Sequence, residues 1–232
     1  MTRERPLTMT ATQRVPTAAP KVLDLRCYLV TSGTGRRTVE AAAAAAAGGA
    51  GMIQVRAKDA STAELLELTC TLAAAVHEAR PATRVVVDDR ADVAFAARRR
   101  GAEVHGVHLG QDDLPVAEAR ALLGPEAIIG LTTGTLATVR GAEEIHHLLD
   151  YVGAGPFRPT PTKDSGREPL GVDGCAALVA ATRLPVVAIG GITPADVPAL
   201  AGIGIAGVAL VRAIMDAEDP AGIARDVVAA QS

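Results

Sequence analysis

Short apolar runs alternate with longer amphipathic stretches along this chain from residue 27 to its end. Each run has the length and the residue types of a buried strand, and turn-forming residues lie on both sides of it. The eight predicted strands are residues 27–31, 52–56, 84–88, 106–109, 128–131, 151–155, 186–189 and 207–211. The chain therefore repeats one strand-containing unit eight times.

Helix-period stretches fill the intervals between these strands. The predicted helices are residues 39–47, 62–79, 92–100, 116–123, 142–149, 175–181, 194–201 and 221–229. Two of them carry clear start signals: Ser61 precedes Thr62 with Glu64 at the spacing of a capping box, and Thr193 precedes Pro194. A strand followed by a helix and another strand predicts parallel pairing.

Eight such units predict one (β/α)8 barrel, a TIM barrel, spanning residues 21–232. The alternative is an open doubly wound sheet. Its dinucleotide-binding turn is absent, because the segment from Thr31 to Gly35 lacks the third glycine and its spacing. Residues 1–20 are rich in Thr, Pro, Arg and Ala and have no apolar core of a secretory signal, so we predict a disordered extension there.

The end of the second predicted strand carries polar residues at every second position. Gln54 and Arg56 face one side of such a strand while Ile53 and Val55 face the other, so neither side is an ordinary solvated face. A shielded arginine followed by Lys58 indicates an anion-binding position.

The other strands also end in polar residues. In a TIM barrel the active site lies at the carboxyl ends of the strands, so these residues converge on one rim. They are Arg56 and Lys58, Asp88-Asp89-Arg90, Gln111-Asp112-Asp113, Thr132, the segment 160–163, Gly190-Gly191 and Arg212. The sequence thus predicts a site at the mouth of the barrel.

Two pairs of adjacent aspartates fall on this rim, Asp88-Asp89 and Asp112-Asp113. Carboxylates without a cluster of His or Cys favour Mg²⁺, which binds one or two carboxylates together with substrate phosphates and water. The alternative is that these aspartates cap the following helices. Their common position on the rim favours the metal site.

Two loops indicate phosphate binding. Gly190-Gly191 follows the seventh strand, where barrels of this type often bind phosphate, although a tight turn that needs a positive φ explains the glycines equally well. The segment 153–163 contains three prolines and presents Thr160, Thr162 and Lys163. Long loops in compact domains are usually functional, so we interpret this one as part of the site rather than as a linker.

Composition narrows the kind of partner. The formal charge is −3 and the basic residues are scattered along the chain, so neither a nucleic acid nor a membrane is expected as a partner. The expected partners are small-molecule substrates. Three separated cysteines suggest neither a disulfide framework nor a zinc site, and the expected compartment is the cytoplasm. His108 is interpreted as a core histidine, and no histidine is assigned a catalytic role. The sequence does not determine the oligomeric state, and a homo-oligomer is one of the possibilities.

Taken in order, these motifs resemble the thiamine phosphate synthase family, also called thiamine-phosphate pyrophosphorylases, from about residue 28 to the end. The motifs are Gln54-x-Arg56-x-Lys58, Asp88-Asp89-Arg90, residues 106–115 (GVHLGQDDLP), residues 155–163 (GPFRPTPTK), Gly190-Gly191-Ile192-Thr193 and residues 207–211 (GVALV). The resemblance implies a TIM-barrel transferase. It would join 4-amino-2-methyl-5-hydroxymethylpyrimidine diphosphate to 4-methyl-5-(2-phosphooxyethyl)thiazole, releasing pyrophosphate and forming thiamine phosphate.

The resemblance also implies roles for individual residues. Asp89 and Asp113 would hold Mg²⁺. The pyrimidine diphosphate would contact Gln54, Arg56, Lys58, Asp88, Thr132 and Lys163, of which Arg56, Lys58 and Lys163 would be catalytic. The thiazole phosphate would contact Thr160, Thr162, Gly191, Val211 and Arg212. The family is expected to react dissociatively, through a pyrimidine carbocation, which requires no protein nucleophile.

Three positions depart from the family pattern: Ala57 replaces a common glutamate, Asp88 a common asparagine, and Arg212 a serine. Asp88 removes an amide donor, and Arg212 introduces a side chain that can pair with the thiazole phosphate itself. Two other functions stay open. A thiazole tautomerase would need a histidine near the fifth strand, where residues 130–135 have none, and a non-catalytic phosphate-binding barrel would have lost the metal or diphosphate residues.

Overall fold

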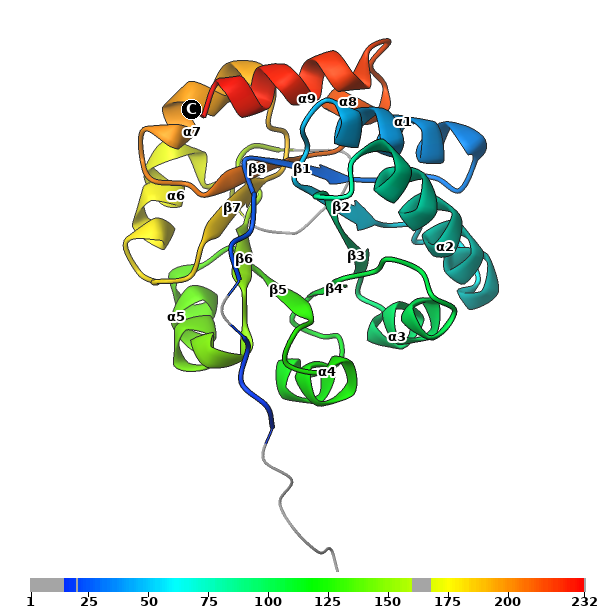
Figure 1. Cartoon of the computed structure of the whole chain (residues 1–232). Helices are drawn as coiled ribbons and strands as arrows, with labels where there is room; N and C mark the ends of the chain where they lie inside the picture. Colours follow the sequence, from blue (N-terminus) through cyan, green and yellow to red (C-terminus); the bar gives the residue numbers. More distant parts are fainter. Residues whose placement is uncertain (1–14, 20, 160–167, 232) are drawn as a thin grey trace, which may run out of the picture.

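Eight parallel strands close into a barrel in this protein, as the sequence predicts (Figure 1). The structure, a computed structural model, describes residues 15–19, 21–159 and 168–231. The strands are β1 (Cys27–Val30), β2 (Met52–Val55), β3 (Arg84–Asp88), β4 (Gly106–Leu109), β5 (Ile128–Thr133), β6 (Tyr151–Ala154), β7 (Val186–Ile189) and β8 (Gly207–Leu210). Each strand pairs with its sequence neighbours, and β1 pairs with β8 to complete the ring.

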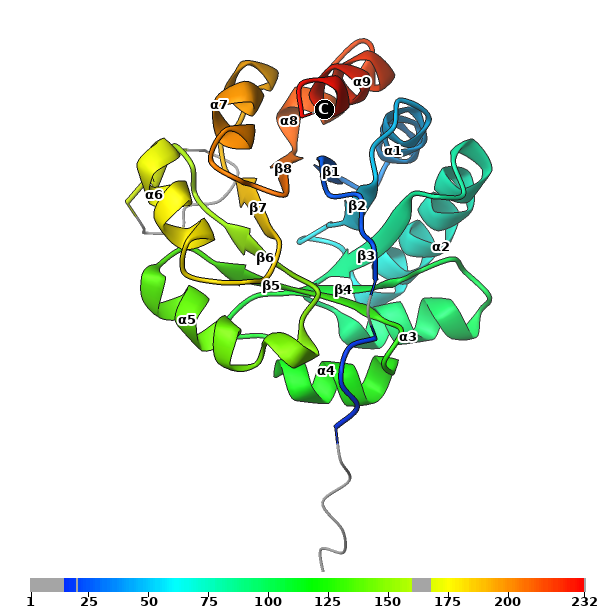
Figure 2. The ribbon, with the colours of Figure 1, turned by 60° about the vertical axis from the view of Figure 1, so that its left-hand side comes forward.

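Helices surround the barrel and cover its outer face (Figures 1 and 2). They are α1 (Arg36–Ala47), α2 (Thr62–Ala79), α3 (Ala91–Arg99), α4 (Val116–Leu123), α5 (Leu136–Glu144), α6 (Gly171–Val179), α7 (Val197–Ala201), α8 (Arg212–Met215) and α9 (Pro220–Ala229), with 3₁₀ turns η1 (His146–Leu148) and η2 (Pro194–Asp196). The predicted capping box forms at Ser61–Glu64. The predicted start signal at Thr193 is also present, and the structure adds a capping box there between Thr193 and Asp196.

The core has two parts because strand side chains alternate between the two faces. Ile53 and Val55 point outward into the larger apolar layer beneath the helices. Met52 points inward and packs with Tyr28 and Tyr151 in a smaller interior cluster. This alternation carries Gln54 and Arg56 into the barrel, as the sequence predicts.

The helix predicted over residues 142–149 is wrong in position. The chain instead forms α5 from Leu136 to Glu144, followed by the 3₁₀ turn η1. Thr135 starts α5 early because its side chain accepts from the amide of Thr138, whose hydroxyl accepts from the amide of Thr135. The short helix α8 was also missed, since four residues give no periodic signal.

The amino-terminal segment packs against the base of the barrel, at the amino ends of the strands. Ala18 and Ala19 donate backbone hydrogen bonds to His147 and Pro125, and the Lys21 ammonium lies 2.8 Å from the Asp150 carboxylate. Residues 15–19 belong to the predicted extension, and these bonds attach them to the barrel. Within the described ranges, no helix is long and apolar enough to cross a membrane.

Candidate active site

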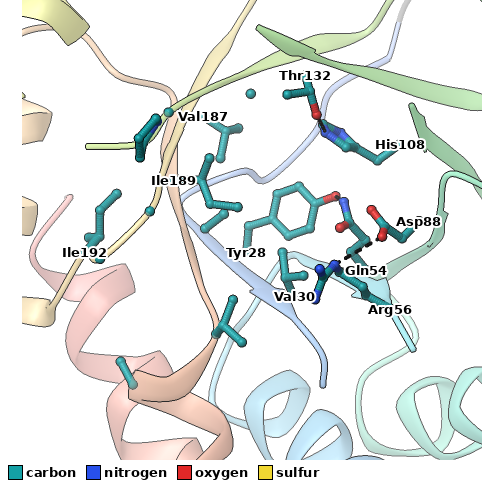
Figure 3. Close-up of a pocket in the computed structure, with 18 of the residues that line it drawn as sticks. Tyr28, Val30, Gln54, Arg56, Asp88, His108, Thr132, Val187, Ile189 and Ile192 are labelled. Carbon is teal, nitrogen blue, oxygen red and sulfur yellow. Dashed lines mark hydrogen bonds and ion pairs between the residues drawn. The ribbon is translucent and has the colours of Figure 1, made fainter. Parts of the chain in front are cut away.

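A cavity of about 430 Å³ opens where the carboxyl ends of the strands meet (Figure 3). Its volume suits a small-molecule site. Its polar lining includes Tyr28, Gln54, Arg56, Asp88, His108, Thr132, Tyr151, Thr193 and Arg212, and its apolar lining includes Val30, Val187, Ile189, Ile192, Ala209 and Val211. The strands therefore deliver many of the predicted site residues to one place.

Arg56 and Asp88 face each other across the wall of the cavity. The Arg56 Nε lies 3.2 Å from Asp88 Oδ2, and both side chains are less than a fifth exposed, at 18% and 13%. Figure 3 shows the pair at the edge of the cavity, beside Gln54. The predicted anion-binding arginine is thus already held by a carboxylate of the next strand.

Lys58 pairs with the neighbouring carboxylate at a more open position. Its Nζ lies 2.9 Å from Asp89 Oδ2, and its side chain is half exposed. Asp89 has a left-handed φ of 60°, a conformation that Asp tolerates better than most residues. Lys58 does not line the cavity itself, so it lies on the rim, and the rim carries a second cation–carboxylate pair.

Asp89 and Asp113 lie close together, as the metal hypothesis requires. Burial opposes ionisation of Asp89, but Lys58 and a hydrogen bond shared with Asp113 lower the pKa of that carboxyl. Burial and the neighbouring Asp89 raise the pKa of Asp113. The Asp113 carboxylate also accepts from the amide of Gly110 at 2.7 Å. The two carboxyls therefore repel each other when both are ionised, which a cation between them would relieve.

The two carboxyls fit Mg²⁺ better than an ion that needs a complete protein cage. No group of three His, Cys, Asp or Glu side chains suited to a metal occurs among the residues that the structure describes. Mg²⁺ commonly takes one or two carboxylates and fills its remaining positions with water and substrate phosphate. The alternative that these aspartates cap helices is not supported, because Arg90 and Pro115 occupy the N-cap positions without a side-chain cap.

A continuous hydrogen-bond network forms the floor of the cavity. Gln54 Nε2 lies 2.8 Å from Tyr28 Oη, which lies 2.7 Å from Tyr151 Oη. Tyr151 Oη lies 3.0 Å from His108 Nδ1, and His108 Nε2 lies 2.9 Å from Thr132 Oγ1. Burial raises the pKa of both tyrosines, so both are neutral phenols. No buried side-chain polar atom of the described residues lacks a partner.

The loop after β7 supplies the predicted glycine turn. Gly190 and Gly191 have φ of 101° and 69°, so the chain there needs a conformation that glycine adopts without strain. Arg158 binds this loop from outside the cavity. Its guanidinium donates to the Gly191 carbonyl at 3.2 Å and makes two bonds to the Asp196 carboxylate, at 2.9 and 2.6 Å.

The remaining predicted residues divide into two groups. Val211 and Arg212 line the cavity at the end of β8, with Arg212 exposed to solvent. Thr160, Thr162 and Lys163 lie outside the described residues, and their assignment stays a prediction.

Sequence reasoning missed Tyr28 and Tyr151 and interpreted His108 as a core histidine. All three lie on inward strand positions and line the cavity. The period-two alternation that placed Gln54 and Arg56 inside the barrel applies equally to Tyr28 and Tyr151, so the signal was present in the sequence.

The fold and the cavity together indicate the class of protein, a TIM-barrel enzyme with its active site at the carboxyl ends of the strands. The family model for thiamine monophosphate synthase matches residues 27–214. The thiamine-phosphate synthases of Corynebacterium jeikeium and Corynebacterium efficiens are 59% and 57% identical over 206 residues, covering 89% and 88% of this chain and 94% of each relative.

Among solved structures, the thiamine phosphate pyrophosphorylase from Pyrococcus furiosus superposes with a TM-score of 0.77 at 33% identity, covering 90% of this chain and 96% of that one. The chain belongs to the thiamine monophosphate synthase family. Its activity is that of a thiamine-phosphate synthase, a transferase of thiamine biosynthesis.

Proposed function

We propose that the cavity joins 4-amino-2-methyl-5-hydroxymethylpyrimidine diphosphate to 4-methyl-5-(2-phosphooxyethyl)thiazole with the assistance of Mg²⁺. The observation that carries this proposal is the rim of alternating charges, in which Arg56 and Lys58 stand beside Asp88, Asp89 and Asp113. A diphosphate and a divalent cation together match this arrangement, because each supplies the opposite charge to one half of it.

The cations of the rim bind the diphosphate and stabilise it as it leaves. Negative charge grows on the leaving oxygens during bond breaking, and fixed positive groups lower the barrier by opposing it. Arg56 and Lys58 fill this role. The family resemblance assigns the same role to Lys163, which lies outside the described residues. When Arg56 and Lys58 turn to the diphosphate, they release Asp88 and Asp89 from their ion pairs.

Asp89 and Asp113 are the residues that would hold Mg²⁺. The metal would supply further positive charge to the leaving diphosphate. Asp89 is the residue best placed to change partner, since its carboxylate pairs with Lys58 in the structure described here.

The two organic substrates occupy different parts of the cavity in this proposal. Gln54 and Thr132 contact the pyrimidine on the floor. Gly191 and the Val211-Arg212 step receive the thiazole phosphate, together with Thr160 and Thr162. Val30, Val187 and Ala209 give the lining of this cavity an apolar part. A dissociative reaction in this cavity needs the two substrates to be positioned and the charge of the leaving diphosphate to be stabilised. It needs no protein nucleophile.

Incubation of the purified protein with both substrates and Mg²⁺ tests the function. We expect thiamine phosphate, detected by mass or by thiochrome fluorescence, and release of pyrophosphate. EDTA should abolish the product, and excess Mg²⁺ should restore it. Full turnover in chelator would remove the metal from the mechanism, and absence of product with both substrates present would overturn the reaction.

A further inference from the structure

Three residues that lie side by side on neighbouring strands allow the network on the cavity floor to form. His108 on β4 is opposite Gly130 on β5, and Gly130 is opposite Tyr151 on β6. A Cβ on Gly130 would lie 2.6 Å from His108 Nδ1 and 2.4 Å from Tyr151 Oη. The missing side chain therefore lets Tyr151 reach His108 across the middle strand.

The hydrogen bonds of this network have one direction. An amide nitrogen only donates, so Gln54 Nε2 donates to Tyr28 Oη. Tyr28 must then use its single proton toward Tyr151, because the structure shows no other partner for Tyr28 Oη among the described residues. The opposite direction would leave a buried hydroxyl proton without an acceptor, which is unfavourable because a buried donor loses its hydrogen bonds to water.

The direction of the hydrogen bonds continues from Tyr151 to the cavity. Tyr151 Oη accepts from Tyr28, so its own proton goes to His108 Nδ1. An imidazole whose Nδ1 accepts carries its proton on Nε2, and His108 Nε2 therefore donates to Thr132 Oγ1. The Thr132 oxygen is thereby an acceptor on the protein side, and its hydroxyl proton is left for the cavity.

We infer that Tyr151 is a positioning residue that acts through His108 to make Thr132 a hydrogen-bond donor toward the substrate. The group that Thr132 recognises is then an acceptor atom at the buried end of the substrate, such as an unprotonated ring nitrogen. This inference rests on the proposed placement of the pyrimidine at Thr132. Without the Tyr151 hydroxyl, His108 can place its proton on either nitrogen, and Thr132 can turn its own proton away from the cavity.

A double-mutant cycle of Tyr151→Phe and Thr132→Val tests this coupling. Each substitution removes one hydroxyl and keeps the shape of the side chain. We expect each single variant to raise KM for the pyrimidine diphosphate about tenfold, the loss of one hydrogen bond, while KM for the thiazole phosphate stays unchanged. If Tyr151 acts only through Thr132, the double variant shows no further loss. Multiplied effects in the double variant would overturn the inference.

The tautomer of His108 gives a readout that does not depend on turnover. ¹⁵N NMR of the wild-type protein should show His108 protonated at Nε2, with the signal assigned by comparison with His108→Gln. Tyr28→Phe is the matched control. It removes a buried hydroxyl that lies 2.7 Å from that of Tyr151, but it keeps the hydroxyl by which Tyr151 donates to His108. We expect Tyr28→Phe to keep the tautomer and Tyr151→Phe to lose it.

The outcomes separate this inference from the proposed function. Wild-type His108 protonated at Nδ1 would overturn the inference whether or not any variant folds. Failure of the wild-type protein to form thiamine phosphate would instead overturn the proposed function, while the tautomer measurement would still stand.

Discussion

At the scale of single residues, the main feature of the site is the ion pair between Arg56 and Asp88. The pair is shielded from solvent on both sides, so its attraction is weakened less by water than that of an exposed pair. A diphosphate that binds Arg56 must compete with Asp88 for it. Asp88 is therefore an internal counterion of Arg56.

Substitutions of the two partners should have opposite effects on the diphosphate substrate. Arg56→Ala should lower the rate of transfer about a hundredfold, since it removes one preorganised electrostatic contact. Asp88→Asn should instead lower KM for the pyrimidine diphosphate several-fold, because it frees Arg56. Steady-state kinetics measure both, and Asp226→Asn, at an exposed position on α9, serves as the control. Unchanged turnover in Arg56→Ala would contradict the assignment.

At the scale of elements, Arg158 ties the segment after β6 to the loop after β7. Its guanidinium binds Gly191 and Asp196 and lies 4.9 Å from the centre of the Phe157 ring. Burial opposes ionisation of Asp196, but Arg158 and Thr193 lower the pKa of its carboxyl. Arg158 does not line the cavity, so under the proposed placement of the thiazole phosphate it acts only through the glycine loop.

Loss of this tie should weaken binding of one substrate more than the other. Arg158→Ala should raise KM for the thiazole phosphate about tenfold and leave KM for the pyrimidine diphosphate unchanged, because only the glycine loop loses its support. Kinetics with each substrate varied in turn measure the difference. Arg225→Ala is a suitable control, since its pair with Asp219 is exposed and longer, at 3.5 Å. Equal changes in both KM values would argue against a local role.

The strands were predictable because each buried run has its own local pattern, and the inward direction of Gln54 and Arg56 followed from that pattern. The ion-pair partners were not. Arg56 meets Asp88 only because β2 and β3 pair in one particular register. Tyr28 and Tyr151 are separated by most of the chain and meet only when the barrel closes. The start of α5 was not predicted, because its capping box is made by two threonines and lacks the glutamate or glutamine that usually marks such a box in a sequence.

At the scale of the whole molecule, chemistry and stability lie at opposite ends of the barrel. Arg120 on α4 is completely buried, and its guanidinium bonds to backbone carbonyls, including those of Leu148 and Ala127, and to the Asp150 carboxylate. Asp150 also binds Lys21 and the amide of Ile129. This network joins the amino-terminal segment, α4 and β5 at the base, away from the cavity.

Removal of this buried charge should destabilise the fold without altering the site. Arg120→Met should lower the free energy of unfolding by about 3 kcal/mol, because several buried carbonyls and one carboxylate lose their donor. Urea unfolding measures the change, and Arg99→Met, exposed on α3, provides the comparison. Both KM values should stay at their wild-type levels below the unfolding transition. A variant as stable as the wild type would contradict the role of the network.

The chain contains no tryptophan and only two tyrosines, and both belong to the network on the cavity floor. Their rings lie 5.8 Å apart. The near-ultraviolet absorption and the intrinsic fluorescence of the protein therefore come almost entirely from the active site. Ligand binding can be followed by this native emission without an added label. Tyr28→Phe and Tyr151→Phe each leave a single tyrosine, so the optical signal of each tyrosine can be recorded separately.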